Sequence, residues 1–430
     1  MNNISTTHGL WAASAPPPPE QPTLQEDLQI DVAIVGAGFT GLSCALHLQQ
    51  RGIKTAVLDA QTVGYGGSGR NVGLVNAGMW VMPSALPGAL GQTYGQRLLH
   101  QLGNGPDLVY ELVSHYGIEC EAVRHGTLHC AVGQSGLDNI TQRAREWQAQ
   151  GAPVHLLDAR ETAKRTGTEA YTGSLLDLRA GTIQPLAYAR GLAHAAVNEG
   201  AQLYGHTEVV SAHDAGTHWT LKTSTGATVH AQWVVVATNA FTNVHGIWGS
   251  IASELVRLPY FNMATPPLPS RMLDKILPGL EGAWDTPDIL TSFRRDKAGR
   301  LVFGSVGALR GTGSTIHHDW GRRAMTKLFP ELRDIGFEHA WYGWIGMTDN
   351  SLPRFHKLAR NTVTFSGYNG RGIAPGTVFG RELARLISGE MKEDELALPV
   401  SDVATTKCKP VKEAYYEIGA QAAHFVGARF

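Results

Sequence analysis

The chain has 430 residues, a formal net charge of −1 at pH 7 and a hydrophobic fraction of 43%, which together predict a globular protein of two or three domains with an ample core. The balanced charge and the lack of long basic runs give no support to nucleic-acid binding, and no apolar run is long enough to cross a membrane. The cysteines are scattered without a C-x-x-C pair and the N-terminus lacks a signal-peptide pattern, so we expect a cytoplasmic protein without disulfides or bound metal.

Residues 1–28 form a leader that precedes the first predicted strand. Its apolar part, Leu10–Ala13, is followed by prolines from Pro16 to Pro19, which favour an extended polyproline conformation. We expect the leader to lie on the surface, either anchored through Trp11 or disordered.

An apolar run from Asp31 ends in Gly36-x-Gly38-x-x-Gly41, and a helical pattern and a second apolar run that ends on Asp59 follow. This order is typical of the dinucleotide-binding βαβ unit. The glycines permit a tight turn, a close approach to a pyrophosphate and close helix–strand packing, and the helix start favours phosphate. Asp59 is placed to accept hydrogen bonds from an adenosine ribose. The predicted cofactor contacts of this unit are Gly36, Gly38, Phe39, Thr40, Gly41, Asp59 and Ala60.

A second glycine-rich stretch, residues 64–75, is too rich in glycine for a regular element. Its glycines let the backbone approach a flat ligand, and its polar side chains can donate hydrogen bonds. A nicotinamide-only Rossmann domain needs no such loop after its second strand, whereas a flavoprotein must grip the ring system as well. We therefore predict FAD as the cofactor, with further contacts from Gly67, Ser68, Gly69, Arg70, Asn71, Val72 and Gly73.

With these motifs the chain resembles the FAD-dependent amine and amino-acid oxidoreductases related to D-amino-acid oxidase, sarcosine oxidase and glycine oxidase. The Ser-Gly-Arg-Asn sequence at Ser68–Asn71 and the Trp-Ala-Ala-Ser leader look most like the branch that holds γ-glutamylputrescine oxidase and bacterial L-pipecolate oxidase. The resemblance covers nearly the whole chain, from about residue 10 to residue 392.

Residues 92–150 carry a helical pattern interrupted by a strand-like stretch at 125–132. His125 and His129 on that stretch, with Cys120 and Cys130 close in sequence, raise the alternative of a metal site. Residues four apart on a strand are about 13 Å apart, so the two histidines would not share one ion, and we expect no metal.

Residues 153–236 predict a hairpin-like stretch at 175–181, a helix from Gln184 to about Glu199 and a set of strands. The resemblance implies that the backbone of Val209 or Val210 contacts the adenine. It also implies that the turn at Ala237 and Thr238, at the end of the last strand, lies near the FAD phosphates.

Residues 246–340 predict the sheet of a substrate domain, with strands at 256–263, 290–295 and 300–304. Tyr260, Thr291 and Phe293 face either the flavin or the core. The stretch His317–Asp319 lies in a glycine- and serine-containing segment, which predicts a solvated loop.

A second strand–glycine loop–helix follows, with a strand at 362–366 and a helix from Val378 to Ile387. The resemblance implies that this loop wraps the ribityl chain and the pyrimidine end of the flavin. The predicted contacts here are Gly346, Gly370, Arg371, Gly372 and Ile373.

The predicted fold class is α/β, with an FAD-binding Rossmann-type domain that is discontinuous in sequence and a substrate domain with a mostly antiparallel sheet. We assign residues 29–91, 152–245 and 341–392 to the FAD domain and residues 92–151 and 246–340 to the substrate domain. The leader covers 1–28, and 393–430 form a tail without an assigned function.

The resemblance implies an enzyme that oxidises the C–N bond of an amine or amino acid by hydride transfer to flavin N5, giving an imine. This chemistry needs no protein nucleophile, because the cofactor carries it. Arg371, Tyr260 and Trp344 are the predicted catalytic residues, and Arg70 and Arg371 are the candidates for positive charge near the flavin. FAD is expected to be non-covalent, because Trp341–Met347, the segment that attaches flavin in sarcosine oxidases, has no cysteine.

The substrate is left between two interpretations. Glycine oxidase has a carboxylate-binding arginine in the segment that matches Trp341–Pro353, where this chain has Ile345. The substrate is therefore an amine without a nearby carboxylate, as in γ-glutamylputrescine oxidase, or its carboxylate binds Arg371, which favours the cyclic amino acid L-pipecolate. A flavin 2-hydroxy-acid dehydrogenase and a non-enzymatic FAD-binding protein are further alternatives, and oxygen or a quinone is the expected electron acceptor. The predicted pocket residues are Met79, Tyr260, Thr291, Phe293, Trp341, Ile345 and Arg371.

Overall fold

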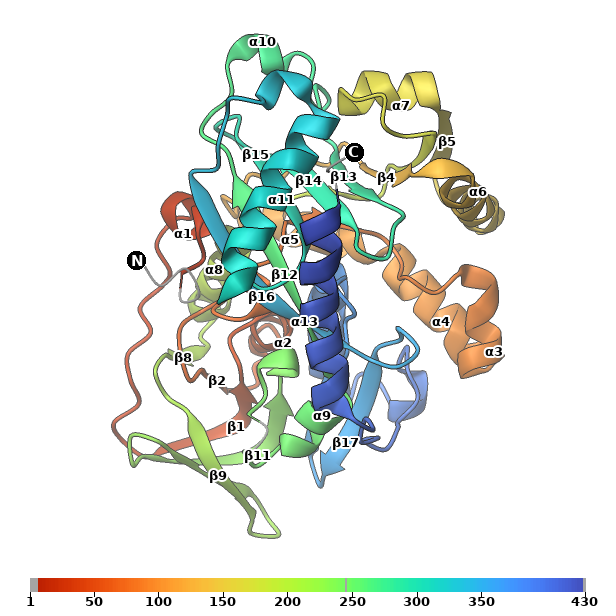
Figure 1. Cartoon of the computed structure of the whole chain (residues 1–430). Coiled ribbons are helices and arrows are strands. Elements are labelled where there is room, and N and C mark those ends of the chain that lie inside the picture. Colours follow the sequence, from red (N-terminus) through yellow and green to blue (C-terminus); the bar gives the residue numbers. More distant parts are fainter. Residues whose placement is uncertain (1–6, 244–245, 428–430) are drawn as a thin grey trace.

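The computed structural model describes residues 7–243 and 246–427. Two eight-stranded sheets form the two halves of the molecule, the first in the lower part of Figure 1 and the second above it. A third, two-stranded sheet pairs residues 74–75 with residues 181–182. The predicted fold class, a Rossmann-type half and a half with a mostly antiparallel sheet, is confirmed.

The first half starts from the predicted βαβ unit: β1 (Leu28–Val35), α2 (Phe39–Gln49) and β2 (Thr55–Leu58). β1 pairs in parallel with β2 on one side and with β11 (Thr228–Val236) on the other. The apolar residues of β1 are buried on both faces, as expected for a central parallel strand. Gly41 is required at the start of α2, because a Cβ there would overlap the carbonyl oxygen of Gly36.

The remaining elements of this half confirm most of the predicted pattern. The strand order is β17-β18-β11-β1-β2-β8, with β9 and β10 completing an antiparallel extension of β11. The helix predicted from Gln184 is α8, and the helix after the second glycine loop, α12, starts five residues earlier than predicted, at Ile373. The bounds are α8 (Pro185–Asn198), β8 (Gln202–Tyr204), β9 (Val209–Asp214), β10 (Trp219–Thr223), β17 (Arg354–Ala359), β18 (Thr362–Ser366) and α12 (Ile373–Ile387).

The second sheet has the order β16-β12-β15-β14-β13-β4-β6-β5, and all its pairs are antiparallel except β13 with β4. It contains β5, β6 and β16, which the predicted division placed in the FAD domain. β6 pairs with β4 along its whole length, and β16 pairs with all of β12, so backbone hydrogen bonds assign these strands to the second sheet. The bounds are β4 (Thr127–Ala131), β5 (Val154–Asp158), β6 (Gly173–Asp177), β12 (Val256–Ala264), β13 (Gly282–Asp285), β14 (Thr291–Arg295), β15 (Leu301–Val306) and β16 (His339–Met347).

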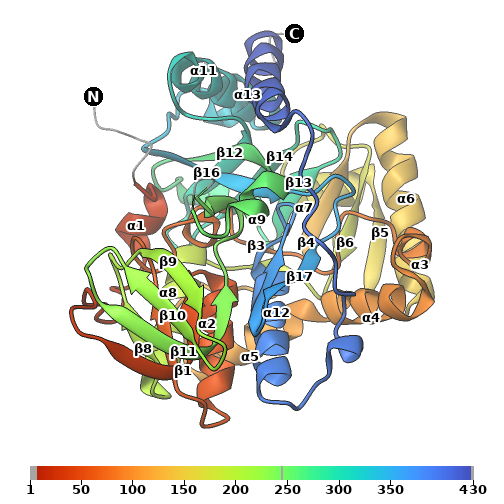
Figure 2. The same ribbon diagram turned by 90° about the horizontal axis from the view of Figure 1, so that it is seen from below.

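Helices cover the outside of both sheets (Figures 1 and 2). The predicted helical stretch after residue 92 is two helices, α4 and α5, separated at Asn104. The remaining bounds are α3 (Leu86–Leu90), α4 (Gln92–Gly103), α5 (Gly105–His115), α6 (Gly133–Ala149), α7 (Ala159–Thr166), α9 (Gly249–Glu254), α10 (Ser270–Leu273), α11 (Thr312–Leu328) and the paired β3 (Leu74–Val75) and β7 (Gly181–Thr182).

The prediction of a loop at His317–Asp319 is wrong, whereas the predicted solvent exposure holds for His318 and Asp319. These residues lie in α11, and the ring of His317 is fully buried. Its Nδ1 lies 2.8 Å from Nδ1 of His424 on α13 (Lys409–Val426), and the ring of His424 stacks on Trp320. Packing against α13 therefore stabilises a helix that the local sequence does not favour (Figure 2).

The described part of the leader is ordered, and its anchor is Trp11. The helix α1 (Leu10–Ser14) places this side chain fully buried, with its ring edge-on to the ring of Trp341. The indole N–H of Trp11 donates to the carbonyl of Asn71 in the first glycine-rich loop. Of the two predicted alternatives, the anchored leader is the one that the structure has.

Candidate functional site

A cavity of about 1090 Å³ extends from the carboxyl end of β1 to one face of the second sheet. Its wall includes both glycine-rich loops, the turn after β11 and side chains from β12, β13, β14 and β16. Most predicted cofactor residues line it: Gly36, Gly38, Phe39, Thr40, Asp59, Ala60, Gly67, Ser68, Arg70, Asn71, Val72, Val209, Ala237, Thr238, Gly346, Gly370, Arg371, Gly372 and Ile373. The other three, Gly41, Gly69 and Gly73, lie behind the wall, where close packing excludes a side chain.

The first end of the cavity is built mainly from backbone. The two carboxylate oxygens of Asp59 accept hydrogen bonds from the backbone N–H groups of Ala37 and Gln61, at 2.7 and 2.8 Å. Burial raises the pKa of this carboxyl. Asp59 therefore fixes the turn after β1 as well as lining the cavity, which is a role that the sequence pattern did not indicate.

The loop after β2 is fixed by its own polar side chains. The amide of Asn71 donates to the carbonyls of Gly67 and Ser68, and its oxygen accepts from Gly73 N. The hydroxyl of Ser68 accepts the N–H of Phe39 at the start of α2. The two phosphate-binding candidates, the helix start and the loop, are thus tied together on one wall.

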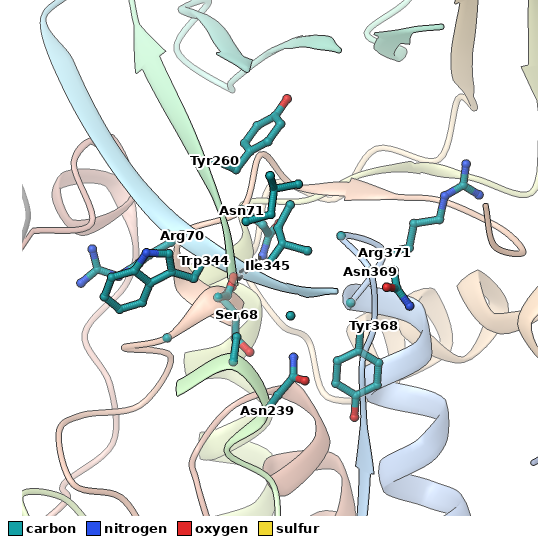
Figure 3. A pocket seen from close by; sticks show the side chains of 18 of the residues that line it. Ser68, Arg70, Asn71, Asn239, Tyr260, Trp344, Ile345, Tyr368, Asn369 and Arg371 are labelled. Atoms are coloured by element: carbon teal, nitrogen blue, oxygen red, sulfur yellow. Dashed lines mark hydrogen bonds between the residues drawn. The ribbon is translucent and has the colours of Figure 1, made fainter. Parts of the chain in front are cut away.

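Arg70 points away from the centre of the cavity in Figure 3. Its guanidinium donates to the carbonyls of Tyr65, Thr7 and Tyr342. These contacts anchor the loop to the leader and to β16. Of the two arginines predicted to place positive charge near the flavin, Arg371 is therefore better supported than Arg70.

The second glycine-rich loop reaches the same cavity from the start of α12. The hydroxyl of Tyr368 lies 2.6 Å from that of Thr40, which joins this loop to the start of α2. The amide oxygen of Asn239, in the turn after β11, accepts the N–H of Gly367. Three chain segments that are distant in sequence therefore meet around one end of the cavity (Figure 3).

Arg371 extends from this loop toward the second sheet and is 8% exposed. Its guanidinium lies over two indole rings, 4.7 Å from the centroid of Trp80 and 5.0 Å from that of Trp284. One terminal N–H donates to the carbonyl of Ala77, and Nε is buried without a hydrogen-bond partner among the described residues. Burial, with the charge of Arg143 nearby, lowers the pKa of Arg371 to about 9.

No salt bridge forms on Arg371 or Arg143 within residues 7–243 and 246–427. Arg143 on α6 is also buried, and it donates to the carbonyls of Met79 and Trp80. Asp177, whose charge reaches Arg371, is held by Arg179 at 2.7 Å. Glu146, on the same helix as Arg143, acts on it through its charge without a salt bridge. Two buried cations without a salt bridge are energetically costly, and an anionic ligand in the cavity would compensate them.

The second sheet contributes a row of side chains on its cavity face. The hydroxyl of Tyr260 on β12 lies 2.6 Å from that of Ser292 on β14, across the intervening strand β15. Gly304 on β15 permits this approach, because a Cβ there would lie 3.0 Å from the Tyr260 ring. In register beside Ser292 is Trp284, and beside Trp284 is His129, whose ring stacks on the indole at 3.5 Å between ring centroids.

The set of residues fits FAD at the first end of the cavity, where glycines leave room for a ligand and backbone N–H groups gather at a helix start. The family model described as "DAO: FAD dependent oxidoreductase" matches residues 31–386. The chain belongs to this family. As a DAO-family protein it is an FAD-dependent oxidoreductase, and its relatives include a gamma-glutamylputrescine oxidoreductase and a glycine oxidase.

Individual relatives agree with the family. The chain is 30% identical to gamma-glutamylputrescine oxidoreductase of Escherichia coli over 393 residues, which is 89% of each chain. It is 29% identical to a probable oxidoreductase, OrdL, of Haemophilus influenzae over 86% of this chain and 85% of that one. Among solved structures, glycine oxidase from Geobacillus kaustophilus has the same fold with a TM-score of 0.71 and 21% identity, over 88% of this chain and 99% of that chain.

In this DAO-family protein, the prediction that Thr291 and Phe293 line the pocket is wrong by one position along the strand. Thr291 and Phe293 do not line the cavity, whereas Ser292 between them does. Successive side chains of a strand point to opposite faces. Phe293 lies in the core cluster on the far face with Phe261 and Phe303, so the cavity face of β14 belongs to Ser292.

The prediction that Met79 and Trp341 line the pocket is also wrong, because neither residue lies in the cavity wall. The side chain of Met79 lies in the core, and its carbonyl accepts a hydrogen bond from Arg143. Trp341 packs on Trp11 and donates its indole N–H to the carbonyl of Arg70. Tyr260, Trp344, Ile345 and Arg371 do line the cavity.

The structure adds wall residues that the sequence did not identify as site residues: Trp80, His129, Arg143, Trp284, Asp285 and Ser292. Alternation along 282–285 and 291–295 could have indicated Trp284 and Ser292. Arg143 had no such signal, because its helix contributes to the wall only through tertiary packing. Of the two histidines considered for metal, His129 is in the wall and His125 instead lies 2.8 Å from the carbonyl of Gly279. Within residues 7–243 and 246–427, no group of three or more His, Cys, Asp or Glu side chains could hold a metal ion.

In the described part of the chain, no helix is long and apolar enough to span a bilayer.

Proposed function

We propose that this protein oxidises the C–N bond of a cyclic secondary amino acid, with L-pipecolate as the preferred candidate. The observation that carries the proposal is Arg371, a buried cation in the cavity wall with no salt bridge in the described chain. A substrate carboxylate would supply the missing anion. The neighbouring indoles of Trp80 and Trp284 would contact the apolar ring of the substrate.

The residues that would hold FAD are those at the first end of the cavity. We assign the pyrophosphate to the N–H groups at the start of α2 and the loop around Ser68, the adenosine ribose to Asp59, and the adenine to the backbone at Val209. The second glycine loop, Gly370–Ile373, and Gly346 would lie against the flavin ring. Bound FAD supplies the electron acceptor for the oxidation.

The chain's own residues position the substrate. Arg371 would hold the carboxylate, and the Tyr260–Ser292 hydroxyl pair and Trp344 would bound the space for the ring. Oxidation requires the substrate nitrogen to be uncharged, and burial in the cavity beside two arginines disfavours an ammonium ion. We retain oxygen or a quinone as the acceptor and the cytoplasm as the location.

A linear amine of the γ-glutamylputrescine type is the second candidate. It is favoured by the Escherichia coli relative, and by Asp285 and Asp288 in the cavity wall, acidic groups that could bind a second ammonium. Burial raises the pKa of Asp285 to about 7, so this carboxyl is only partly ionised at neutral pH. That weakens the acidic site relative to the two arginines.

A 2-hydroxy-acid dehydrogenase is the third candidate. Such an enzyme would need a histidine near the flavin ring. Neither glycine-rich loop contains one, but His129 lines the cavity, so turnover of hydroxy acids must be measured alongside that of amines.

The test is steady-state turnover of L-pipecolate, γ-glutamylputrescine and 2-hydroxy acids by the wild type and by Arg371→Ala. Losing one side of a buried ion pair typically costs about 3–5 kcal/mol. We therefore expect the variant to raise the Michaelis constant for pipecolate by roughly two to three orders of magnitude. An unchanged constant, or fast turnover of γ-glutamylputrescine with none of pipecolate by the wild type, would overturn the proposal.

We also expect the flavin to be bound non-covalently, because Trp341–Met347 has no cysteine. Precipitation of the holoenzyme with acid should release the yellow colour into the supernatant. Colour that stays in the protein pellet would contradict this expectation.

A further inference from the structure

The cavity wall contains one imidazole that the proposed function does not use. His129 is 6% exposed, and its Nδ1 is buried without a hydrogen-bond partner among the described residues. Its neighbours on β4, Leu128 and Cys130, face the opposite core. The alternation of the strand therefore directs His129 to the cavity face, where its ring stacks on Trp284.

Charged groups approach His129 from several elements. Arg143 comes from α6 and Arg371 from the loop before α12, and both lower its affinity for a proton. Asp285, at the end of β13, also lines the cavity and accepts the N–H of Thr291, but it is paired with Cys130 and its charge does not act on His129. The partner of His129 on β6 is the apolar Leu175. Burial and the two arginines hold the pKa of His129 well below its ordinary value, so the free protein has a neutral imidazole here.

The reaction needs a proton acceptor close to the substrate. An aliphatic ammonium has a pKa of about 10, so an amine substrate enters mainly as a cation, and its nitrogen must lose a proton before the C–N bond is oxidised. Tyr260 already shares a hydrogen bond with Ser292, and one oxygen of Asp285 is held by Thr291. Of the titratable groups in the wall, His129 combines a neutral form with an imidazole ring that makes no hydrogen bond in the described part of the chain; Nδ1 is buried, so Nε2 is the nitrogen that would accept a proton from the cavity.

We propose that His129 accepts the proton that the substrate ammonium loses in the cavity. One N–H bond of the substrate breaks, its electron pair stays on the substrate nitrogen as a lone pair, and a new N–H bond forms on the imidazole. The positive charge moves from the substrate to His129, and no electrons leave the substrate in this step.

The two arginines make this transfer depend on the carboxylate. Before the substrate binds, their positive charges oppose protonation of His129. A carboxylate bound at Arg371 offsets part of that charge and makes the imidazole more basic. The His129 imidazole is therefore neutral when the substrate arrives, and it becomes a better proton acceptor once the substrate is bound. This step rests on the proposed function, because it needs an anionic amine substrate.

The first test compares pH profiles of kcat/KM for L-pipecolate in the wild type, His129→Gln and the matched control His125→Gln, which changes a histidine outside the cavity wall. General acid–base groups typically contribute about 10²–10⁴-fold. We expect His129→Gln to lose about 100-fold or more near neutral pH and to recover as the pH rises toward the ionisation of the free amine. Loss by a constant factor at every pH would assign His129 a merely structural role and overturn the proposal.

The second test does not depend on turnover. Binding of benzoate, a carboxylate without an amine, is measured by calorimetry of the holoenzyme at pH 6 in buffers of different ionisation enthalpy. The wild type and His125→Gln should take up protons on binding, whereas His129→Gln should not. Equal uptake in all three proteins would contradict the proposal, and the flavin spectrum checks that each variant is folded and loaded.

A third variant tests whether the charge of Arg143 lowers the pKa of His129. Arg143→Gln removes one cation near His129, which should raise the pKa of the imidazole and move the acidic limb of the kcat/KM profile to higher pH. A limb that stays in place would count against the coupling. If the wild type oxidises γ-glutamylputrescine but not pipecolate, the proposed function fails, and the benzoate measurement, which needs no turnover, tests His129 by itself.

Discussion

The two ends of the cavity are built from different materials. At the first end, backbone N–H groups, glycines and short polar side chains such as Ser68 and Asn71 shape the wall. At the second end, large side chains from separate strands and loops meet, with Arg371, Trp284 and His129 in contact around one point. At the first end, a substitution that shifts the backbone therefore alters the wall itself. At the second end, substitutions of side chains can alter which ligand binds while the sheet keeps its structure.

The largest effect is expected at the backbone-built end. Gly41→Ala places a Cβ on the carbonyl oxygen of Gly36, and this main-chain atom cannot move without displacing the turn. We expect purified protein without bound flavin, measured by its absorbance spectrum. Gly88→Ala is the matched control, because a Cβ at Gly88 meets open space. Full flavin content in Gly41→Ala would mean that the turn does not hold the cofactor.

Asp59→Ala tests one side chain at the same end. Charge-assisted hydrogen bonds to a ribose would contribute roughly 2–5 kcal/mol, which corresponds to a rise of about 30- to 5,000-fold in the dissociation constant of FAD. Loss of the contacts to Ala37 and Gln61 adds to this effect. Fluorescence titration of the apoprotein measures the constant. The control is Asp31→Ala, an exposed acid of β1 that accepts Lys54 N, and a similar constant for both variants would refute the assignment.

The smallest effect is expected at the side-chain-built end. Tyr260→Phe removes one hydroxyl from a pair that has no charge, and a hydrogen bond of this kind contributes about 0.5–1.5 kcal/mol. We expect a change of up to about tenfold in kcat/KM for pipecolate, with flavin content unchanged. Ser292→Ala should have the same effect, and the double variant should be no worse than either. Additive losses would show that the two hydroxyls act separately.

Sequence predicted the backbone-built end well because its signals are local. The glycines at 36–41 and 67–73, and Asp59 at the end of a strand, each need only their neighbours in sequence to be recognised. At the second glycine loop the sequence also indicated Arg371, which lines the cavity, although it did not indicate the two indoles beside it.

The other end depends on facts that a single segment does not contain. Which face of β14 meets the cavity is decided by its pairing with β15 and β13, so Thr291 and Phe293 were chosen where Ser292 was correct. Arg143 reaches the wall from a helix whose own pattern reads as an ordinary surface helix. The helix α11 was missed because Gly313 and Ser314 disfavour it locally, and its packing on α13 and on the core of the second sheet compensates.

The contact between Trp11 and Trp341 has a consequence for how the chain is made. The ribosome completes the leader first, but its partner in β16 emerges some 330 residues later. Until then the loop at Gly64–Asn71 lacks the hydrogen bond from the Trp341 indole to the carbonyl of Arg70, and Trp11 lacks the ring that packs on it. The cofactor pocket of a nascent chain is therefore incomplete until synthesis has nearly finished, and flavin capture should be a late, post-translational event.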